Sequence, residues 1–66
     1  MRSILLEAAE AYFQGLIKRH VSNVEVLLNR PAGIGEHQDI QESLEIELGK
    51  IADFHDKLEV IQKYFD

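Results

Sequence analysis

The residues from Asn29 to Asp39, NRPAGIGEHQD, constrain the fold more than any other part of this chain. Pro31 lacks an N–H group and disfavours a helical conformation at Arg30, while Gly33 and Gly35 give the backbone the freedom to reverse direction. These helix breakers divide the chain into two segments of nearly equal length. The sequence therefore predicts an all-α fold, a hairpin of two antiparallel helices joined by a turn.

Apolar residues recur with helical spacing on both sides of the turn. In the first segment a heptad frame contains Leu6, Phe13, His20 and Leu27 at one position and Ala9, Leu16 and Asn23 at another, with Ile17 and Val24 beside them. In the second segment the corresponding residues are Ile40, Leu44, Ile51, Phe54, Leu58, Ile61 and Phe65, with Leu48 substituting where Glu47 breaks the pattern. These spacings indicate helices over about residues 3–28 and 40–64, with the turn at 29–39. Ser3 and Asp39 are the predicted caps.

Folding the chain about this turn brings together positions whose numbers add to roughly 67. This pairing places His20 near Leu48. It also places Gly15 and Gly49 about one turn apart in height, although glycine inside a helix costs about 1 kcal/mol relative to alanine. We expect the two helices to approach closely at these glycines.

The end of the hairpin where the chain termini meet has more apolar residues than two helices can bury against each other. A helix that is apolar on more than one face needs a further packing partner, and a second copy is the most economical one. A single domain of 66 residues without cysteine also needs association, because a core of this size rarely supplies more than roughly 3–5 kcal/mol. We therefore expect a homodimer that forms a four-helix bundle. Its candidate interface residues are Leu5, Tyr12, Val60, Ile61 and Tyr64.

Charge and composition exclude several classes of function. The net charge is −5, from 12 acidic and 7 basic side chains, so binding to nucleic acid or to anionic lipid is disfavoured. No apolar run approaches the ~20 residues that span a membrane. The lack of cysteine suits a reducing cytoplasm. We expect a cytoplasmic protein whose partner is another protein.

The sequence contains no recognisable catalytic constellation, metal-binding spacing or phosphate loop, so we expect no enzymatic activity and no cofactor. His20 lies at a seam position, where a hydrogen bond to a neighbour or to a dimer mate is the simplest role. His55 and Glu59 are spaced to meet on one helix face, but two ligands are too few for a metal site. The alternative is an enzyme or metal site, formed if His20 or His55 converges with carboxylates across a dimer interface.

The predicted turn and the start of the second helix contain the candidate docking residues Gly33, Ile34, Gly35, Glu36 and His37. Turn and capping chemistry explains these residue types. The alternative is an exposed recognition feature, because loops on rigid scaffolds often carry function.

Two resemblances follow from this hairpin. The segment from Leu27 to Ile40, with its GIGEH turn, and the following motif Asp56-Lys57-Leu58-Glu59 resemble small helical-hairpin proteins encoded by large tailed phages. That resemblance implies fold and phage origin, with a place in the host cytoplasm or the virion, but no particular chemistry. In size and architecture the hairpin is also similar to a plasmid-encoded RNA-binding hairpin that dimerises into a four-helix bundle, with Phe13, Gln14 and Lys18 as the reminiscent residues.

Together these patterns predict a non-enzymatic interaction or assembly protein, a homodimeric hairpin that docks another protein. The acidic face of the second helix and the turn are the expected docking features. The alternative is an RNA-binding hairpin dimer that uses Lys18, Arg19 and Arg30, and it requires a contiguous positive stripe across both subunits.

Overall fold

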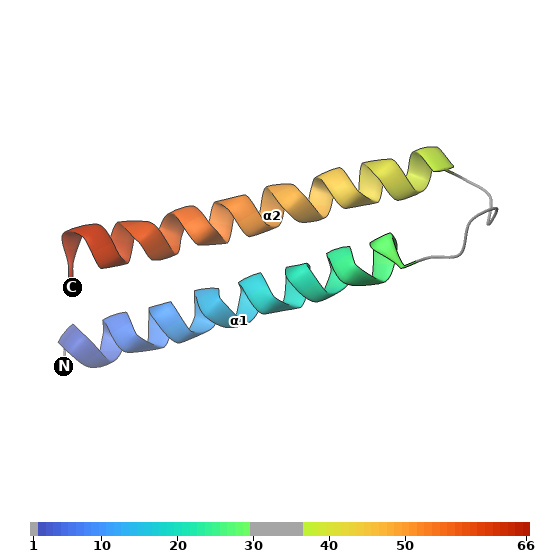
Figure 1. The fold of residues 1–66 in the computed structure, drawn as a ribbon. Helices are drawn as coiled ribbons and strands as arrows, with labels where there is room; N and C mark the ends of the chain where they lie inside the picture. Colours follow the sequence, from blue (N-terminus) through green and yellow to red (C-terminus); the bar gives the residue numbers. More distant parts are fainter. Residues whose placement is uncertain (1, 30–36) are drawn as a thin grey trace.

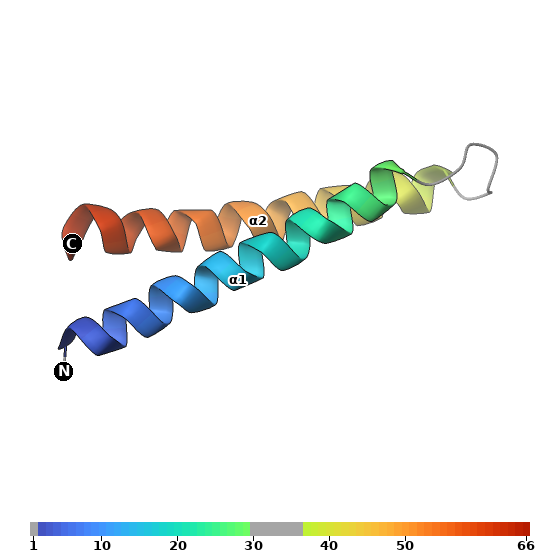
Figure 2. The same cartoon turned by 60° about the horizontal axis from the view of Figure 1, so that its bottom comes forward.

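The computed structural model describes residues 2–29 and 37–66, and these residues form two helices. Helix α1 spans Arg2–Leu28 and helix α2 spans His37–Tyr64. The helices lie side by side and antiparallel, with both chain ends at the same end of the hairpin (Figures 1 and 2). The predicted all-α hairpin is confirmed, and the part of the chain that the structure describes contains no strand.

Helix α2 begins at His37, about one turn before the predicted start. Asp39 therefore lies inside the first turn of α2 rather than at its cap. A carboxylate in the first turn still interacts favourably with the positive end of the helix dipole. Helix α1 has no acidic residue in its first turn.

The seam between the helices consists of buried and half-buried residues that recur at alternating intervals of three and four. In α1 these are Leu6, Glu10, Phe13, Ile17, His20, Val24 and Leu27, and in α2 they are Ile40, Leu44, Glu47, Ile51, Phe54, Leu58 and Ile61. The prediction that Leu48 replaces Glu47 is wrong. Leu48 is 50% exposed, whereas the Glu47 side chain is only 16% exposed because it lies against His20.

Two contacts across the seam establish the register of the helices. The rings of Phe13 and Phe54 stack with centroids 6.2 Å apart, and His20 hydrogen-bonds to Glu47. Both pairs have residue numbers that fit the predicted fold-back about the turn. This register gives the height of each residue, which is its position along the long axis of the hairpin, relative to the residues of the other helix.

The two helix glycines do not mark a close approach, so that prediction is wrong. A Cβ atom built on Gly15 or on Gly49 meets nothing within 4 Å. Both glycines are exposed, because the seam residues of the two helices point elsewhere. Their backbone freedom serves no contact within the described hairpin.

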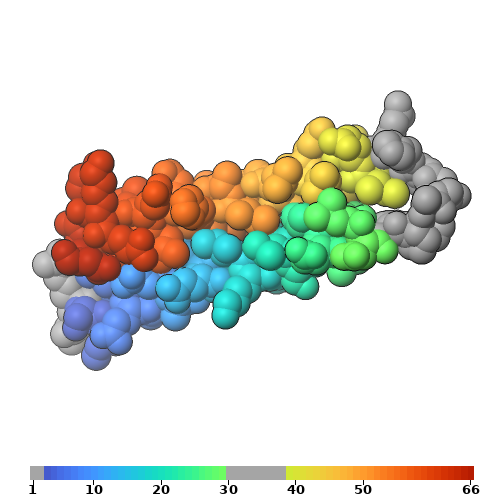
Figure 3. Space-filling model, viewed as in Figure 1, coloured from blue at the N-terminus to red at the C-terminus, as the bar shows by residue number. Residues whose placement is uncertain are grey.

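The hairpin is a thin rod of 52 × 14 × 11 Å with almost no core (Figure 3). Among the described residues, Ile61 is the only buried hydrophobic one, and no side chain falls below 2% exposure. Eleven large hydrophobic side chains are exposed: Ile4, Leu5, Tyr12, Val21, Val26, Leu28, Ile46, Leu48, Val60, Tyr64 and Phe65. Since apolar burial is the dominant favourable term in folding, one hairpin leaves much of its stabilising surface in water.

Candidate functional site

A polar cluster occupies the centre of the seam. Nδ1 of His20 lies 2.6 Å from Oε1 of Glu47, and Nδ2 of Asn23 donates to the same oxygen at 2.8 Å. An ionised carboxylate can only accept hydrogen bonds, so the ring proton of His20 lies on Nδ1. His20 is 8% exposed, and its ring stacks on Phe54 with centroids 5.7 Å apart. The prediction of a seam histidine bonded to a neighbour is confirmed.

The cluster also determines the charge state of Glu47. Hydrogen bonds from His20 and then from Asn23 hold the pKa of the Glu47 carboxyl below its ordinary value, against a smaller opposing effect of burial. The ionised form of Glu47 is thus the stabilised form. A half-buried carboxylate with two donors fixes which residues of the helices face each other, because any slip leaves it unpaired.

His55, in α2, has an exposed position. Nε2 of His55 lies 3.7 Å from Oε2 of Glu59, and both side chains are more than half exposed. Within residues 2–29 and 37–66, no three side chains of the types that bind metal converge on one point. His55 and Glu59 thus form an exposed contact between residues four apart on one helix face.

The five candidate interface residues fall into two groups. Leu5, Tyr12, Val60 and Tyr64 are all exposed, with values between 42% and 68%. Ile61 is 8% exposed and lies in the seam, so it contributes to the hairpin itself rather than offering surface to a second copy.

The exposed members of this set belong to a longer pattern, which we name the outer stripe. The stripe consists of exposed residues at seven-residue intervals, each directly before a seam residue: Leu5, Tyr12, Arg19 and Val26 on α1 and Ile46, Asp53 and Val60 on α2, with Asp39 continuing the same spacing toward the turn. Because the helices are antiparallel and the offset from the seam is the same in both, all seven lie on one side of the hairpin. Tyr64 lies four residues after Val60 and extends the stripe.

Ion pairing and aromatic contacts connect the middle of the outer stripe to the seam. Nζ of Lys57 donates to Asp53 at 3.1 Å, and it lies 5.6 Å from the Phe54 ring centroid and 5.9 Å from that of Phe13. Both members of this pair are at least half exposed, so its contribution to stability is small. Lys57 covers the stacked rings from the side of the outer stripe.

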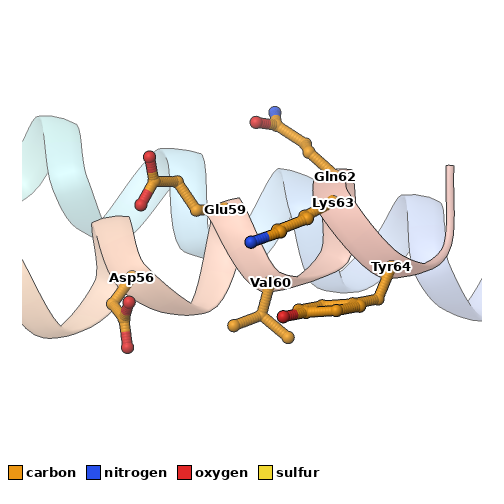
Figure 4. A pocket seen from close by; sticks show the side chains of 6 residues that line it. All are labelled: Asp56, Glu59, Val60, Gln62, Lys63 and Tyr64. Carbon is orange, nitrogen blue, oxygen red and sulfur yellow. The ribbon is translucent and has the colours of Figure 1, made fainter.

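The face of α2 directed away from α1 is acidic. The described helix contains seven acidic and three basic side chains, and four of the acidic ones share its outward face: Glu42, Glu45, Asp56 and Glu59. Figure 4 shows the open-end part of this helix, where Asp56, Glu59 and Lys63 lie close to Val60 and Tyr64. These residues border a shallow hollow on the surface. The acidic face and the outer stripe thus meet at the open end.

The predicted docking residues Gly33, Ile34, Gly35 and Glu36 lie outside the described residues. His37 is the first residue of α2, but its side chain is not among those described. Of the predicted basic patch, Lys18 and Arg19 are exposed on α1, and Arg30 lies outside the described part.

Sequence reasoning missed the role of Glu47 because it treated a charge in a heptad as an interruption. The signal was present, since His20 and Glu47 are opposite each other in the predicted fold-back and have complementary hydrogen-bonding groups. A polar residue at a seam position of each helix, at the same height, indicates a pair.

In comparisons with other proteins, no family model, no curated protein and no solved structure matches the chain. No helix in the described part of the chain has the length and apolarity required to cross a membrane.

Proposed function

We propose that the protein is a non-enzymatic interaction or assembly protein, a homodimer of helical hairpins that presents an acidic surface to another protein. One observation supports this proposal above all. Among the described residues, a single hydrophobic side chain is buried, whereas eleven large ones are exposed. A monomeric protein rarely exposes so much of its apolar surface, and larger apolar patches mark interaction sites.

The amount of surface available is sufficient for association. A stable interface buries about 800 Å² on each partner, which is roughly a sixth of the 5245 Å² on the hairpin. In a rod this narrow, only a long side provides that area. Packing two hairpins along their long sides gives a four-helix bundle.

The acidic face of α2 supports the second part of the proposal. Glu42, Glu45, Asp56 and Glu59 point away from α1 and lie beside the outer stripe rather than in it, so they stay accessible at its edge after the hairpins pair. A protein with a basic surface matches this charge, and complementary charges accelerate and orient association. Origin in a tailed phage, as the resemblance of the turn implies, is consistent with such an assembly role.

Capture from native cells tests the docking face. Immobilised wild-type protein is compared with the double variant Glu45→Lys/Glu59→Lys, whose exposed changes lie outside the seam. We expect proteins retained by the wild type to be lost by this variant. Lys18→Glu serves as the matched control, since it alters charge on the other helix and is expected to retain the partner.

Two further variants, Glu36→Ala and His37→Ala, examine the predicted docking turn. If they fold normally and lose the partner, the turn contributes to recognition. Recovery of the same proteins by the wild type and all charge variants contradicts the proposed docking face.

A further inference from the structure

The outer stripe has a pattern that repeats when the hairpin is turned end over end. On α1 its residues are apolar, aromatic, cationic and apolar, from Leu5 through Tyr12 and Arg19 to Val26. On α2 they are apolar, acidic and apolar, from Ile46 through Asp53 to Val60. Over these residues both helices have apolar side chains on either side of a charge near the middle of the stripe, and Asp39 lies beyond Ile46 toward the turn. The seam contacts place the two middles at nearly the same height.

Exposure shows that the hairpin itself does not use these apolar ends. Leu5, Tyr12 and Val26 on α1 are each more than 60% exposed, and Ile46 on α2 is 51% exposed. A closed dimer uses the same patch on both subunits, so the patch must complement itself. A two-fold rotation about an axis perpendicular to the helices, passing by the middle of the stripe, meets this requirement.

We propose that a second copy packs on the outer stripe in the opposite direction, with the open end of one hairpin against the turn end of the other. In this arrangement α1 packs on α1 and α2 packs on α2. Leu5 of one copy meets Val26 of the second copy, and Tyr12 meets Arg19. The inference rests on the proposed homodimer and specifies its face and its direction.

Charge favours this direction over the alternative. End-over-end reversal brings Asp53 of one copy to the height of Lys50 of the second copy, which gives two symmetric pairs of opposite charge. Packing the copies in the same direction instead places α1 beside α2 of the second copy. Arg19 then lies at nearly the same height as Lys50, so two cations face each other.

Aromatic chemistry gives a second reason. Reversal brings the guanidinium of Arg19 to the exposed ring of Tyr12 in the second copy, and it does so twice by symmetry. Arginine over a tyrosine ring is a favourable cation–π contact. The acidic face of α2 borders this interface at the open end, where Asp56 and Glu59 lie beside Val60 and Tyr64.

Single cysteines test the direction, because the chain has no cysteine of its own. Leu5→Cys and Val26→Cys proteins are mixed under reducing conditions and then treated with a short bis-maleimide. Each protein carries one cysteine, so every cross-link joins two chains. In copies packed in the same direction the two sites lie about 32 Å apart in height, beyond the reach of the reagent. Val21→Cys, which follows His20 and lies on the opposite side from Arg19, is the matched control for Val26→Cys.

We expect the mixed Leu5→Cys and Val26→Cys sample to give cross-linked dimer, and Leu5→Cys alone or mixed with Val21→Cys to give little. Efficient cross-linking of Leu5→Cys to itself means that the open ends meet, which overturns the proposed direction. A dimer in light scattering that no mixture cross-links overturns the proposed face. A monomer in light scattering, with the helical content of the wild type, overturns the homodimer of the proposed function itself.

Discussion

Two carboxylates occupy seam positions in this hairpin, and their surroundings are opposite. Glu47 accepts hydrogen bonds from His20 and Asn23, which lower its pKa. Glu10 lies at the open end, where partial burial and then the nearby carboxyl of Asp66 raise its pKa. The same residue type at equivalent positions is therefore stabilised as an anion in one half of the seam and destabilised in the other.

The difference shows that the two halves of the hairpin are not equally complete. The central cluster satisfies its own polar groups and fixes the register of the helices. The open end brings two carboxyls together beside exposed apolar residues such as Leu5 and Tyr64. An end with unfavourable charge contacts and unburied apolar surface is the end that gains most from a further partner.

Removing the His20 side chain should destabilise the hairpin more than any other change considered below. His20→Ala leaves the Glu47 carboxylate and Asn23 without the ring and removes the stack on Phe54. We expect the free energy of unfolding to fall by about 2 kcal/mol, measured by chemical denaturation. His55→Ala is the matched control, because that side chain is 62% exposed, and it should change stability by less than about 0.5 kcal/mol. Equal losses in the two variants contradict a special role for the cluster.

Replacing Gly15 or Gly49 with alanine should stabilise the hairpin by similar amounts. Neither Gly15 nor Gly49 has an atom within 4 Å of an added Cβ, so alanine is accommodated without a clash. Each change should raise the free energy of unfolding by about 0.5–1 kcal/mol through backbone entropy and helix propensity. Thermal and urea denaturation measure the gain. A loss of stability in either variant indicates a contact at that glycine that the isolated hairpin lacks.

As the pH falls, protonation of Glu47 and protonation of Glu10 should change the stability of the hairpin in opposite directions. The pKa of Glu47 is lowered by folding, so its contribution to stability is present above the ordinary carboxyl value and is lost as the pH falls through its folded value. The pKa of Glu10 is raised, so its penalty applies near neutral pH and disappears as the pH falls below the ordinary value. Stability of the wild type should therefore rise slightly on mild acidification and then fall.

Glu47→Gln should remove most of the fall at low pH, and Glu10→Gln should remove the initial rise. Melting temperatures across the acidic range record both. If the two variants follow the wild-type profile in parallel, other carboxyls control the acid response.

The smallest effect is expected at the last residue of the chain. Asp66→Asn removes the carboxyl charge beside Glu10, so the melting temperature at neutral pH should rise slightly. The matched control is Asp56→Asn, which lies on the outward face of α2 away from Glu10. No difference between these two variants shows that the two carboxyls do not interact in solution.

Most of the fold was predictable from the sequence. Pro31 and its neighbouring glycines indicated the reversal, and the spacing of Phe13, Phe54 and Ile61 indicated which helix faces meet. Helical periodicity is a strong signal because the spacing of apolar residues reflects backbone geometry directly. The register followed from the near-equal lengths of the two segments.

Periodicity did not distinguish the seam from the outer stripe, because both follow the same heptad spacing. Tyr12 and Phe13 are adjacent aromatic residues, yet Phe13 packs against Phe54 whereas Tyr12 is 63% exposed. The role of Glu47 was also missed, because a hydrogen-bonded pair depends on two side chains distant in sequence. A close approach of the helices at Gly15 and Gly49 was wrongly predicted, because the prediction considered their positions along the hairpin but not the direction in which each residue faces around its helix.

We propose that one hairpin leaves too much apolar surface exposed and that two copies associate through these exposed apolar residues. Light scattering on the purified protein at micromolar concentration tests it most directly. We predict a mass of twice the 7.6 kDa of one chain for the wild type, and a lower mass with reduced helicity for Tyr12→Asp. His55→Asp, on the opposite side of the hairpin, should retain the wild-type mass. A compact, stably folded wild-type monomer at that concentration contradicts the claim.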